Sequence, residues 1–204
     1  MKNWRRHLQY GWWKYVAILV IPIILWSLVF SALGRIKPNE RVNILILGEG
    51  VDCKALQSHL EQKIDQLTDQ TIISIKVDSQ RAKGEYFHQK MIANSIDYDI
   101  IVATEQEMPE NFGQSYFYPM REIDQPGYEN VTYYTEEIED YTKTYGIELL
   151  DANQTNLFGT FYSGTGKCYA FFTTDTVNIY PVNQNSQPGN DAALKVLAYL
   201  LQIP

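Results

Sequence analysis

Residues 15–34 contain no charged side chain, and Lys14 and Arg35 border this run on either side. A helix of about 20 residues is roughly 30 Å long, which matches the hydrocarbon core of a bilayer. No later run in the sequence approaches this length without a charge. The sequence therefore predicts four parts: a basic, aromatic tail (1–14), a transmembrane helix (15–34) in contact with the lipid bilayer, a linker (35–41) and a folded domain (42–204).

The basic residues around this run indicate its orientation. Lys2, Arg5, Arg6 and Lys14 precede it, and Arg35, Lys37 and Arg41 follow it. Positive residues collect on the cytoplasmic side of a membrane, so we expect a cytoplasmic N-terminus and an extracytoplasmic domain in a single-pass protein of the cell membrane. A cleaved signal peptide is the alternative, but its apolar core is usually about 7–15 residues long and ends in small residues. The greater length of this run favours a retained anchor.

Charge is distributed unevenly along the chain. All 24 acidic residues follow position 39, where they face 11 basic residues and give this part a net charge of −13. Such a surface repels nucleic acid, so we expect no nucleic-acid partner. The charge is compatible with a cationic or basic partner, and also with a role in solubility alone.

The first half of the domain alternates between strand and helix patterns. Residues 42–47 are apolar on both faces apart from Asn43, as in a buried central strand, and Asp52 can begin an amphipathic helix with Leu56, Leu60, Ile64 and Leu67 on one face. Strands are predicted again over 71–77 and 98–103, with a helix over 82–95 between them. Three strands joined by two helices predict parallel pairing.

The second half has weaker patterns. Residues 111–166 are rich in Gly, Pro, Asn and Tyr and are interpreted as an irregular insertion, with a helix over 135–144 and a short strand over 147–150. Strands are predicted over 168–174 and 177–182. Asp191 then begins a last helix, which should pack on the sheet through a shared apolar face made of Ala193, Leu194, Leu197, Leu200 and Leu201.

Several phrases of the sequence, in this order, resemble the extracellular solute-binding proteins of bacterial transporters, especially the sugar-binding class. They are the strand phrase SIDYDIIVATEQEM, the turn phrase YFYPMREID and the closing phrase VNIYPVNQNSQPGNDAALKVLAYLLQIP. The segment WKYVAILVIPIILW after a basic tail is similar to membrane-anchored proteins that carry a reduced form of such a lobe. The resemblance covers Val42–Met120 and Lys167–Pro204.

This resemblance implies an α/β fold: a three-layer αβα lobe with a mostly parallel sheet, as in periplasmic binding proteins, and a second lobe that is reduced or absent. It also implies a membrane-anchored, extracytoplasmic binding or accessory protein that engages a small ligand or a protein partner near a membrane complex such as a transporter. The alternatives are a structural accessory subunit of a transporter and a hydrolase that uses paired carboxylates. No motif places such a pair, so we expect no enzymatic activity.

Candidate ligand-binding residues follow from the predicted parallel strands, because ligands bind outside the carboxyl ends of strands in open α/β sheets. After the first strand these residues are Gly48, Glu49, Gly50 and Asp52, and after the third strand they are Thr104 and Glu105. The alternative interpretation is a tight glycine turn followed by a helix that Asp52 caps.

Other polar groupings do not indicate a site. Residues 163–168 resemble a phosphate loop but lack its first glycine and its final Ser/Thr, and they precede a strand instead of opening a helix. The three histidines have no second ligand at metal-binding spacing, and the acidic run 136–140 is interpreted as a solvated helix face. We therefore expect no metal and no cofactor. Cys53 and Cys168 form an even pair, for which the sequence leaves a disulfide open.

Overall fold

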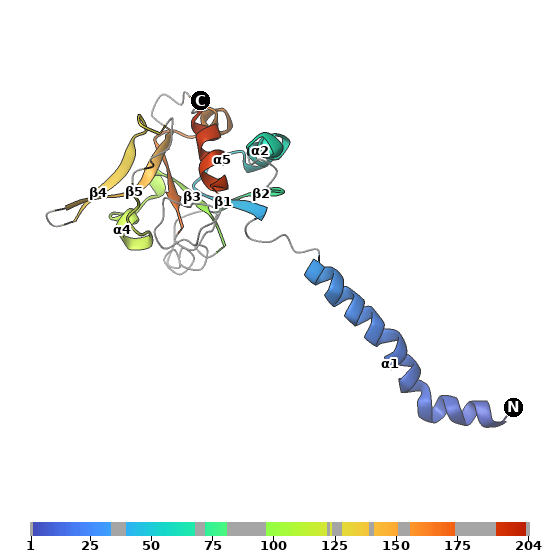
Figure 1. The fold of residues 1–204 in the computed structure, drawn as a ribbon. Helices are drawn as coiled ribbons and strands as arrows, with labels where there is room; N and C mark the ends of the chain where they lie inside the picture. The colour runs from blue at the N-terminus through green and yellow to red at the C-terminus, as the bar shows by residue number, and fades with distance from the viewer. Residues whose placement is uncertain are drawn as a thin grey trace. The chain divides into compact units, whose positions relative to one another are not determined.

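The structure is a computed structural model that describes residues 2–33, 40–67, 72–80, 97–121, 123, 128–138, 141–150, 156–173 and 191–202. The chain divides into two compact units, Met1–Ile36 and Lys37–Pro204 (Figure 1). Two predicted elements, the helix over 82–95 and the strand over 177–182, lie outside the described residues.

The first unit contains the helix α1 (Lys2–Leu33). Its segment Gly11–Phe30 is 20 residues long and apolar enough to cross a membrane by length and composition. Apolar side chains along it are exposed, for example Ile18 and Trp26 at 69% and 65%. This exposed apolar surface is compatible with the transmembrane helix that the uncharged run predicts.

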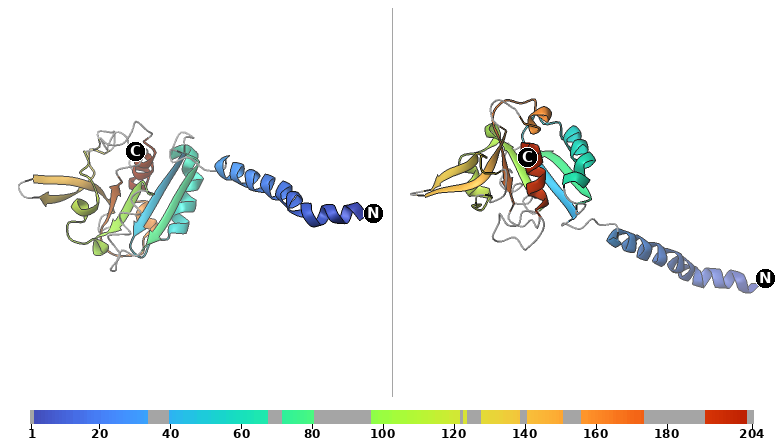
Figure 2. Two further views of the ribbon diagram at one scale, coloured as in Figure 1. Left: turned by 90° about the horizontal axis from the view of Figure 1, so that it is seen from below. Right: turned by 45° about the horizontal axis from the view of Figure 1, so that its top comes forward.

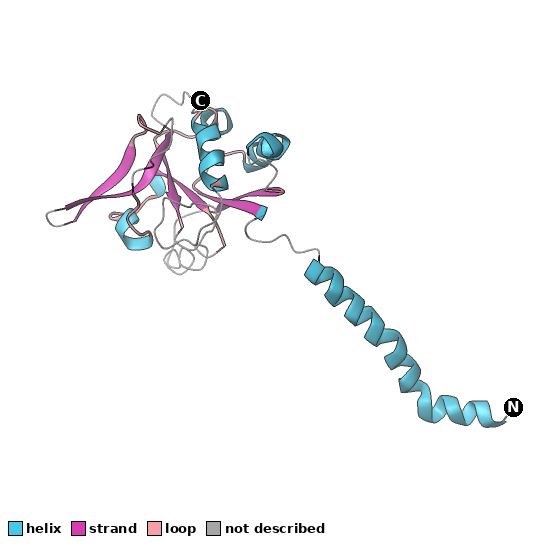
Figure 3. Ribbon diagram, in the orientation of Figure 1, coloured by secondary structure: helices cyan, strands magenta, loops and turns pink. Residues whose placement is uncertain are grey.

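The second unit is a mixed α/β domain built on one sheet (Figure 3). Its strands are β1 (Arg41–Leu47), β2 (Ser74–Gln80), β3 (Ile100–Thr104), β4 (Tyr133–Ile138), β5 (Tyr141–Leu150) and β6 (Cys168–Phe172). They pair in the order β2-β1-β3-β6-β5-β4. In this described sheet β1 is parallel to β2 and β3, and the other three pairings are antiparallel. The parallel expectation thus holds for the first three strands and fails for the sheet as a whole.

Alternate residues of β1 face two separate apolar clusters. Val42, Ile44 and Ile46 belong to a cluster shared with the helices α2 (Cys53–Leu67) and α5 (Ala192–Leu201). Leu45 and Leu47 belong to a second cluster, on the face covered by α4 (Phe112–Tyr116) (Figure 2). This burial on both faces explains why β1 is apolar at nearly every position.

The segment 111–166 contributes more regular structure than its composition predicts. The predicted helix over 135–144 is wrong, because β4 and β5 form an antiparallel hairpin there, with Tyr133 opposite Ile147. Thr and Tyr favour strands, and cross-strand pairing outweighed the weak helical pattern of the acidic run. The same segment also holds α4 and the short 3₁₀ helix η3 (Phe158–Phe161).

The helix α5 packs as its pattern predicts. Ala193, Leu194, Leu197 and Leu200 are almost fully buried in the cluster that contains the β1 side chains. Tyr128 donates a hydrogen bond from its hydroxyl to the carbonyl oxygen of Leu194, 2.7 Å away. The C-terminal helix is therefore an integral part of the core.

Candidate ligand-binding pocket

The order of the first three strands defines a switch point in the sheet. From β1 the chain passes through α2 to β2 on one side, and it later returns to β3 on the other side of β1. Connections that leave in opposite directions from neighbouring strands open a crevice outside their carboxyl ends. The carboxyl end of β1 leads into the turn 48–50, and that of β3 leads into the 3₁₀ helix η2 (Glu105–Glu107).

Two glycines allow the turn after β1 to pack closely. Gly48 has a φ of +141°, and a Cβ atom added there would lie 2.9 Å from the Thr104 side chain. Gly50 has a φ of +91°, and its Cβ atom would lie 2.9 Å from the backbone nitrogen of Gly164. Side chains are strained at such φ values, so glycine is required at both positions.

The glycine-rich loop 162–166, between η3 and β6, is hydrogen-bonded to the turn after β1. Ser163 donates to the carbonyl oxygen of Gly50 from its backbone nitrogen at 2.7 Å and from its hydroxyl at 2.9 Å. The backbone nitrogen of Asp52 donates to the carbonyl oxygen of Phe161 at 2.9 Å. These bonds hold one end of the loop against β1.

Two further bonds hold the other end of the loop against η2. The backbone nitrogen of Glu105 donates to the carbonyl oxygen of Lys167 at 2.9 Å. The side-chain amide of Gln106 donates to the carbonyl oxygen of Thr165 at 3.2 Å. The loop is thus fixed to both strand ends that flank the switch point.

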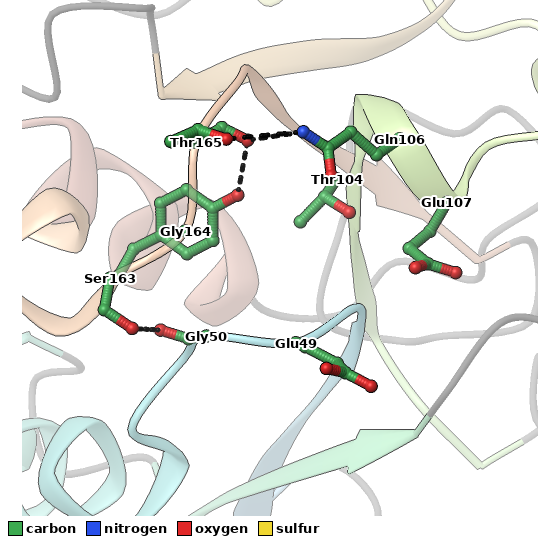
Figure 4. Close-up of a pocket in the computed structure, with 9 residues that line it drawn as sticks. Glu49, Gly50, Thr104, Gln106, Glu107, Ser163, Gly164 and Thr165 are labelled. Carbon is green, nitrogen blue, oxygen red and sulfur yellow. Dashed lines mark hydrogen bonds between the residues drawn. The ribbon is translucent and has the colours of Figure 1, made fainter.

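A pocket of about 790 Å³ lies between these three segments (Figure 4). The turn after β1, the end of β3 with η2, and the loop 162–166 all contribute residues to it. Its lining consists of Glu49, Gly50, Thr104, Gln106, Glu107, Tyr162, Ser163, Gly164 and Thr165. This volume falls within the range of small-molecule sites.

The lining is polar and acidic. Glu49 and Glu107 lie opposite the loop 162–166 in the view of Figure 4, and the described residues that line the pocket include no Lys, Arg or His. Burial raises the pKa of Tyr162 to about 12, and its hydroxyl donates to the carbonyl oxygen of Thr165 at 3.1 Å. The described part of the pocket lining therefore offers carboxylates and hydroxyls.

The structure brings half of the sequence-predicted site residues to this pocket. Glu49, Gly50 and Thr104 line it, and Gly48 lies beneath Thr104. Asp52 does not line it, because its carboxylate accepts a 3.0 Å bond from the backbone nitrogen of Ala55 and begins α2. Glu105 is exposed, and its backbone nitrogen donates to the carbonyl oxygen of Lys167, the residue that follows the loop.

Sequence reasoning missed the loop 162–166 as a wall of the pocket. Its glycines indicate a plain turn, because a phosphate loop has to follow a strand. Here the loop precedes β6, and β6 runs antiparallel to β3, with Cys168 opposite Thr104. A loop that precedes an antiparallel strand lies at the same edge of the sheet as the carboxyl ends of the parallel strands beside it. The loop 162–166 therefore lies next to the ends of β1 and β3. Gln106 and Glu107 were missed because they lie in the 3₁₀ helix after β3.

The remaining groupings have structural roles. His59 is partly buried, and its Nε2 atom lies 2.9 Å from the hydroxyl of Tyr199 on α5. Glu136 is not on a solvated helix face but on β4, where it is 9% exposed. No group of three or more His, Cys, Asp or Glu side chains is placed to hold a metal in the part of the chain that the structure describes.

The two cysteines are free thiols in the structure, so the disulfide that the sequence leaves open is not formed there. Cys168 is buried, and this burial raises the pKa of its thiol to about 12. Cys53 is half-buried, and burial also raises the pKa of its thiol. A thiol held in its neutral form is a weak nucleophile, so neither cysteine adds a reactive group to the pocket.

Comparison with protein-family models, with curated proteins and with solved structures finds no significant match to this chain.

Proposed function

We propose that this chain is a membrane-anchored binding protein whose α/β domain lies outside the cytoplasm and takes a ligand in the pocket at the carboxyl ends of β1 and β3. The ligand is a small molecule or an exposed group of a protein partner near a membrane complex. The domain acts by binding, without catalysis, as a single lobe related to solute-binding proteins.

The observation that carries this proposal is the position of the pocket. It lies at the switch point of the parallel strands, where α/β sheets bind ligands, and its walls come from three segments far apart in sequence. The polar lining and the hydrogen bonds that fix the loop 162–166 favour a preformed binding site. The apolar segment Gly11–Phe30 supports the membrane anchor.

A blocking substitution tests the binding role. The full chain in lipid nanodiscs is screened against a library of polar metabolites and short peptides by saturation-transfer NMR. Thr165→Trp should fill the pocket, since Thr165 is an exposed lining residue, while Thr142→Trp places the same ring at an exposed position of β5 outside the pocket. We expect ligands that bind the native chain and Thr142→Trp but not Thr165→Trp. The same binding profile for all three would contradict the proposal and favour a purely structural accessory subunit.

Protease accessibility tests the orientation. Protease added to intact cells without a wall should degrade the domain and leave the tail protected. Protection of the domain would overturn the extracytoplasmic assignment.

A further inference from the structure

The helix α1 is longer than its apolar segment, because it begins nine residues before Gly11, where that segment starts. We propose, on the basis of the membrane anchor proposed above, that residues 2–10 form an interfacial helix that binds the headgroups of anionic phospholipids. The ligand is the lipid of the same bilayer that the apolar segment crosses.

The charge of residues 2–10 favours an anionic surface. Lys2, Arg5 and Arg6 lie in this stretch, and the first acidic residue of the chain is Glu40. The positive charge is therefore not compensated by any carboxylate nearby in sequence. Each Lys or Arg close to an anionic bilayer strengthens binding about fivefold, so three of them together give a preference on the order of a hundredfold.

The helical register separates basic from apolar residues. Side chains three or four residues apart share one face of an α-helix, and Lys2, Arg5 and Arg6 have this spacing. Trp4 and Leu8 are also four residues apart, and at 3.6 residues per turn they fall on the opposite side of the helix. A helix with basic residues on one face and Trp and Leu on the other lies in the plane of the bilayer interface.

The course of α1 is compatible with such a position. Its N-terminal end turns away from the line of the rest of the helix in Figure 1 and in the left view of Figure 2. A straight helix would carry Lys2 roughly 14 Å beyond Gly11, which is farther than the Debye length of about 8 Å at physiological ionic strength. With the apolar segment across a bilayer, the turn reduces this height and brings the basic residues closer to the headgroups.

Two tryptophans indicate the depth of the helix at this point. Trp12 and Trp13, at the start of the apolar segment, are 59% and 58% exposed. The Nζ atom of Lys14 lies 5.9 Å from the centre of the Trp13 ring. Tryptophan is enriched at the level of the headgroups, where its ring meets both hydrocarbon and water. Residues 2–10 directly precede this level, so the lipid headgroups are their nearest neighbours outside the chain.

Fluorescence of Trp4 tests the inference in the full chain. Trp12, Trp13 and Trp26 are replaced by Phe, which leaves Trp4 as the single tryptophan. The chain is then placed in nanodiscs of phosphatidylglycerol or of phosphatidylcholine, and the neutral quencher acrylamide measures how far water reaches the ring. We expect a quenching constant at least about threefold lower in phosphatidylglycerol, because the charge draws the helix onto the surface. Sodium chloride at about 0.5 M should remove most of this difference.

Matched variants separate the basic face from the net charge. Arg5→Gln with Arg6→Gln should raise quenching in phosphatidylglycerol to the level in phosphatidylcholine, since the loss of two charges weakens binding about 25-fold. Arg35→Gln with Lys37→Gln removes two charges after the apolar segment and should leave the quenching of Trp4 unchanged. Arg5→Leu with Leu8→Arg keeps the composition and the charge but breaks the basic face, so it should also raise quenching.

Three results would overturn the inference. Equal quenching of Trp4 in the two lipids would refute the preference for anionic headgroups. Equal effects of the charge removals on the two sides of the apolar segment would show a response to net charge alone. Full protection of Trp4 after the exchange of Arg5 and Leu8 would refute the amphipathic helix.

The same samples test the membrane anchor separately. Elution of the chain together with the nanodisc reports that the apolar segment is inserted, whatever the quenching of Trp4. A chain that does not enter the nanodisc would contradict the anchor of the proposed function. A chain that enters it without protection of Trp4 would contradict the lipid site alone.

Discussion

Replacing Glu136 with glutamine should destabilise the domain by about 3 kcal/mol. The Glu136 carboxylate on β4 accepts hydrogen bonds from the backbone nitrogens of Gly113 and Gln114, at 2.7 and 2.8 Å, and from the hydroxyl of Tyr134 at 2.8 Å. It therefore holds the first turn of α4 against the β4–β5 hairpin. All three partners are donors, and the carboxylate accepts them with both of its oxygens. A glutamine side chain has only one oxygen, so its NH₂ group would face one of the backbone N–H groups.

The magnitude follows from the burial of this group. Glu136 is 9% exposed, and a buried hydrogen bond to a charged group contributes about 1.5–3 kcal/mol. Loss of the charge together with one misplaced donor gives about 3 kcal/mol, a large share of the 5–15 kcal/mol typical of a domain. Gly113 leaves little room for rearrangement, because a Cβ atom there would lie 2.7 Å from the ring of Tyr145.

Urea unfolding followed by tyrosine fluorescence measures this loss. All four tryptophans lie in the first 26 residues, so tyrosine reports on the domain. Glu137→Gln, at the neighbouring exposed position, is the control and should change the free energy of unfolding by less than about 0.5 kcal/mol. Hydrogen exchange at Gly113 and Gln114 should accelerate in Glu136→Gln alone. A free energy of unfolding equal to that of Glu137→Gln would refute the reasoning.

Two further predictions concern the core beside the pocket. In the native chain a thiol reagent should modify Cys53 and leave Cys168 unmodified until urea is added, and equal rates would refute the burial of Cys168. Burial raises the pKa values of Cys168 and Tyr162 to about 12, so the stability that their neutral forms provide should be complete below about pH 9 and fall as the pH rises toward 12. Urea midpoints from pH 8 to 11 measure this decline, which should be shallower in Cys168→Val.

The parts of the fold that follow from sequence are those with strong local patterns. The uncharged run predicts α1, and the helical spacing of Leu56 and Leu60 predicts α2, because periodicity reports directly on which side chains are buried. The parallel pairing of β1 with β2 and β3 follows from the alternation of strands and helices. The same logic places Glu49, Gly50 and Thr104 at the pocket, since each follows or ends a parallel strand.

The rest depends on contacts between distant residues. The hairpin of β4 and β5 is stabilised by cross-strand pairs such as Tyr133 with Ile147, and a local window cannot detect such pairs. The direction of β6 relative to β3 decides where Ser163 and Thr165 lie, and no local pattern encodes that direction. The burial of Glu136 likewise depends on α4 packing beside β4.

The central claim is that the domain binds its ligand in the pocket at the ends of β1 and β3. Amide spectra of the full chain in nanodiscs, labelled with ¹⁵N on threonine alone, test this during titration with a ligand that the metabolite and peptide screen identifies. Thr104 and Thr165 line the pocket, and Thr142 lies outside it on β5. The account predicts saturable shifts of the Thr104 and Thr165 signals with no shift of Thr142. Shifts at Thr142 of equal size, or no shift at Thr104 and Thr165, would contradict it.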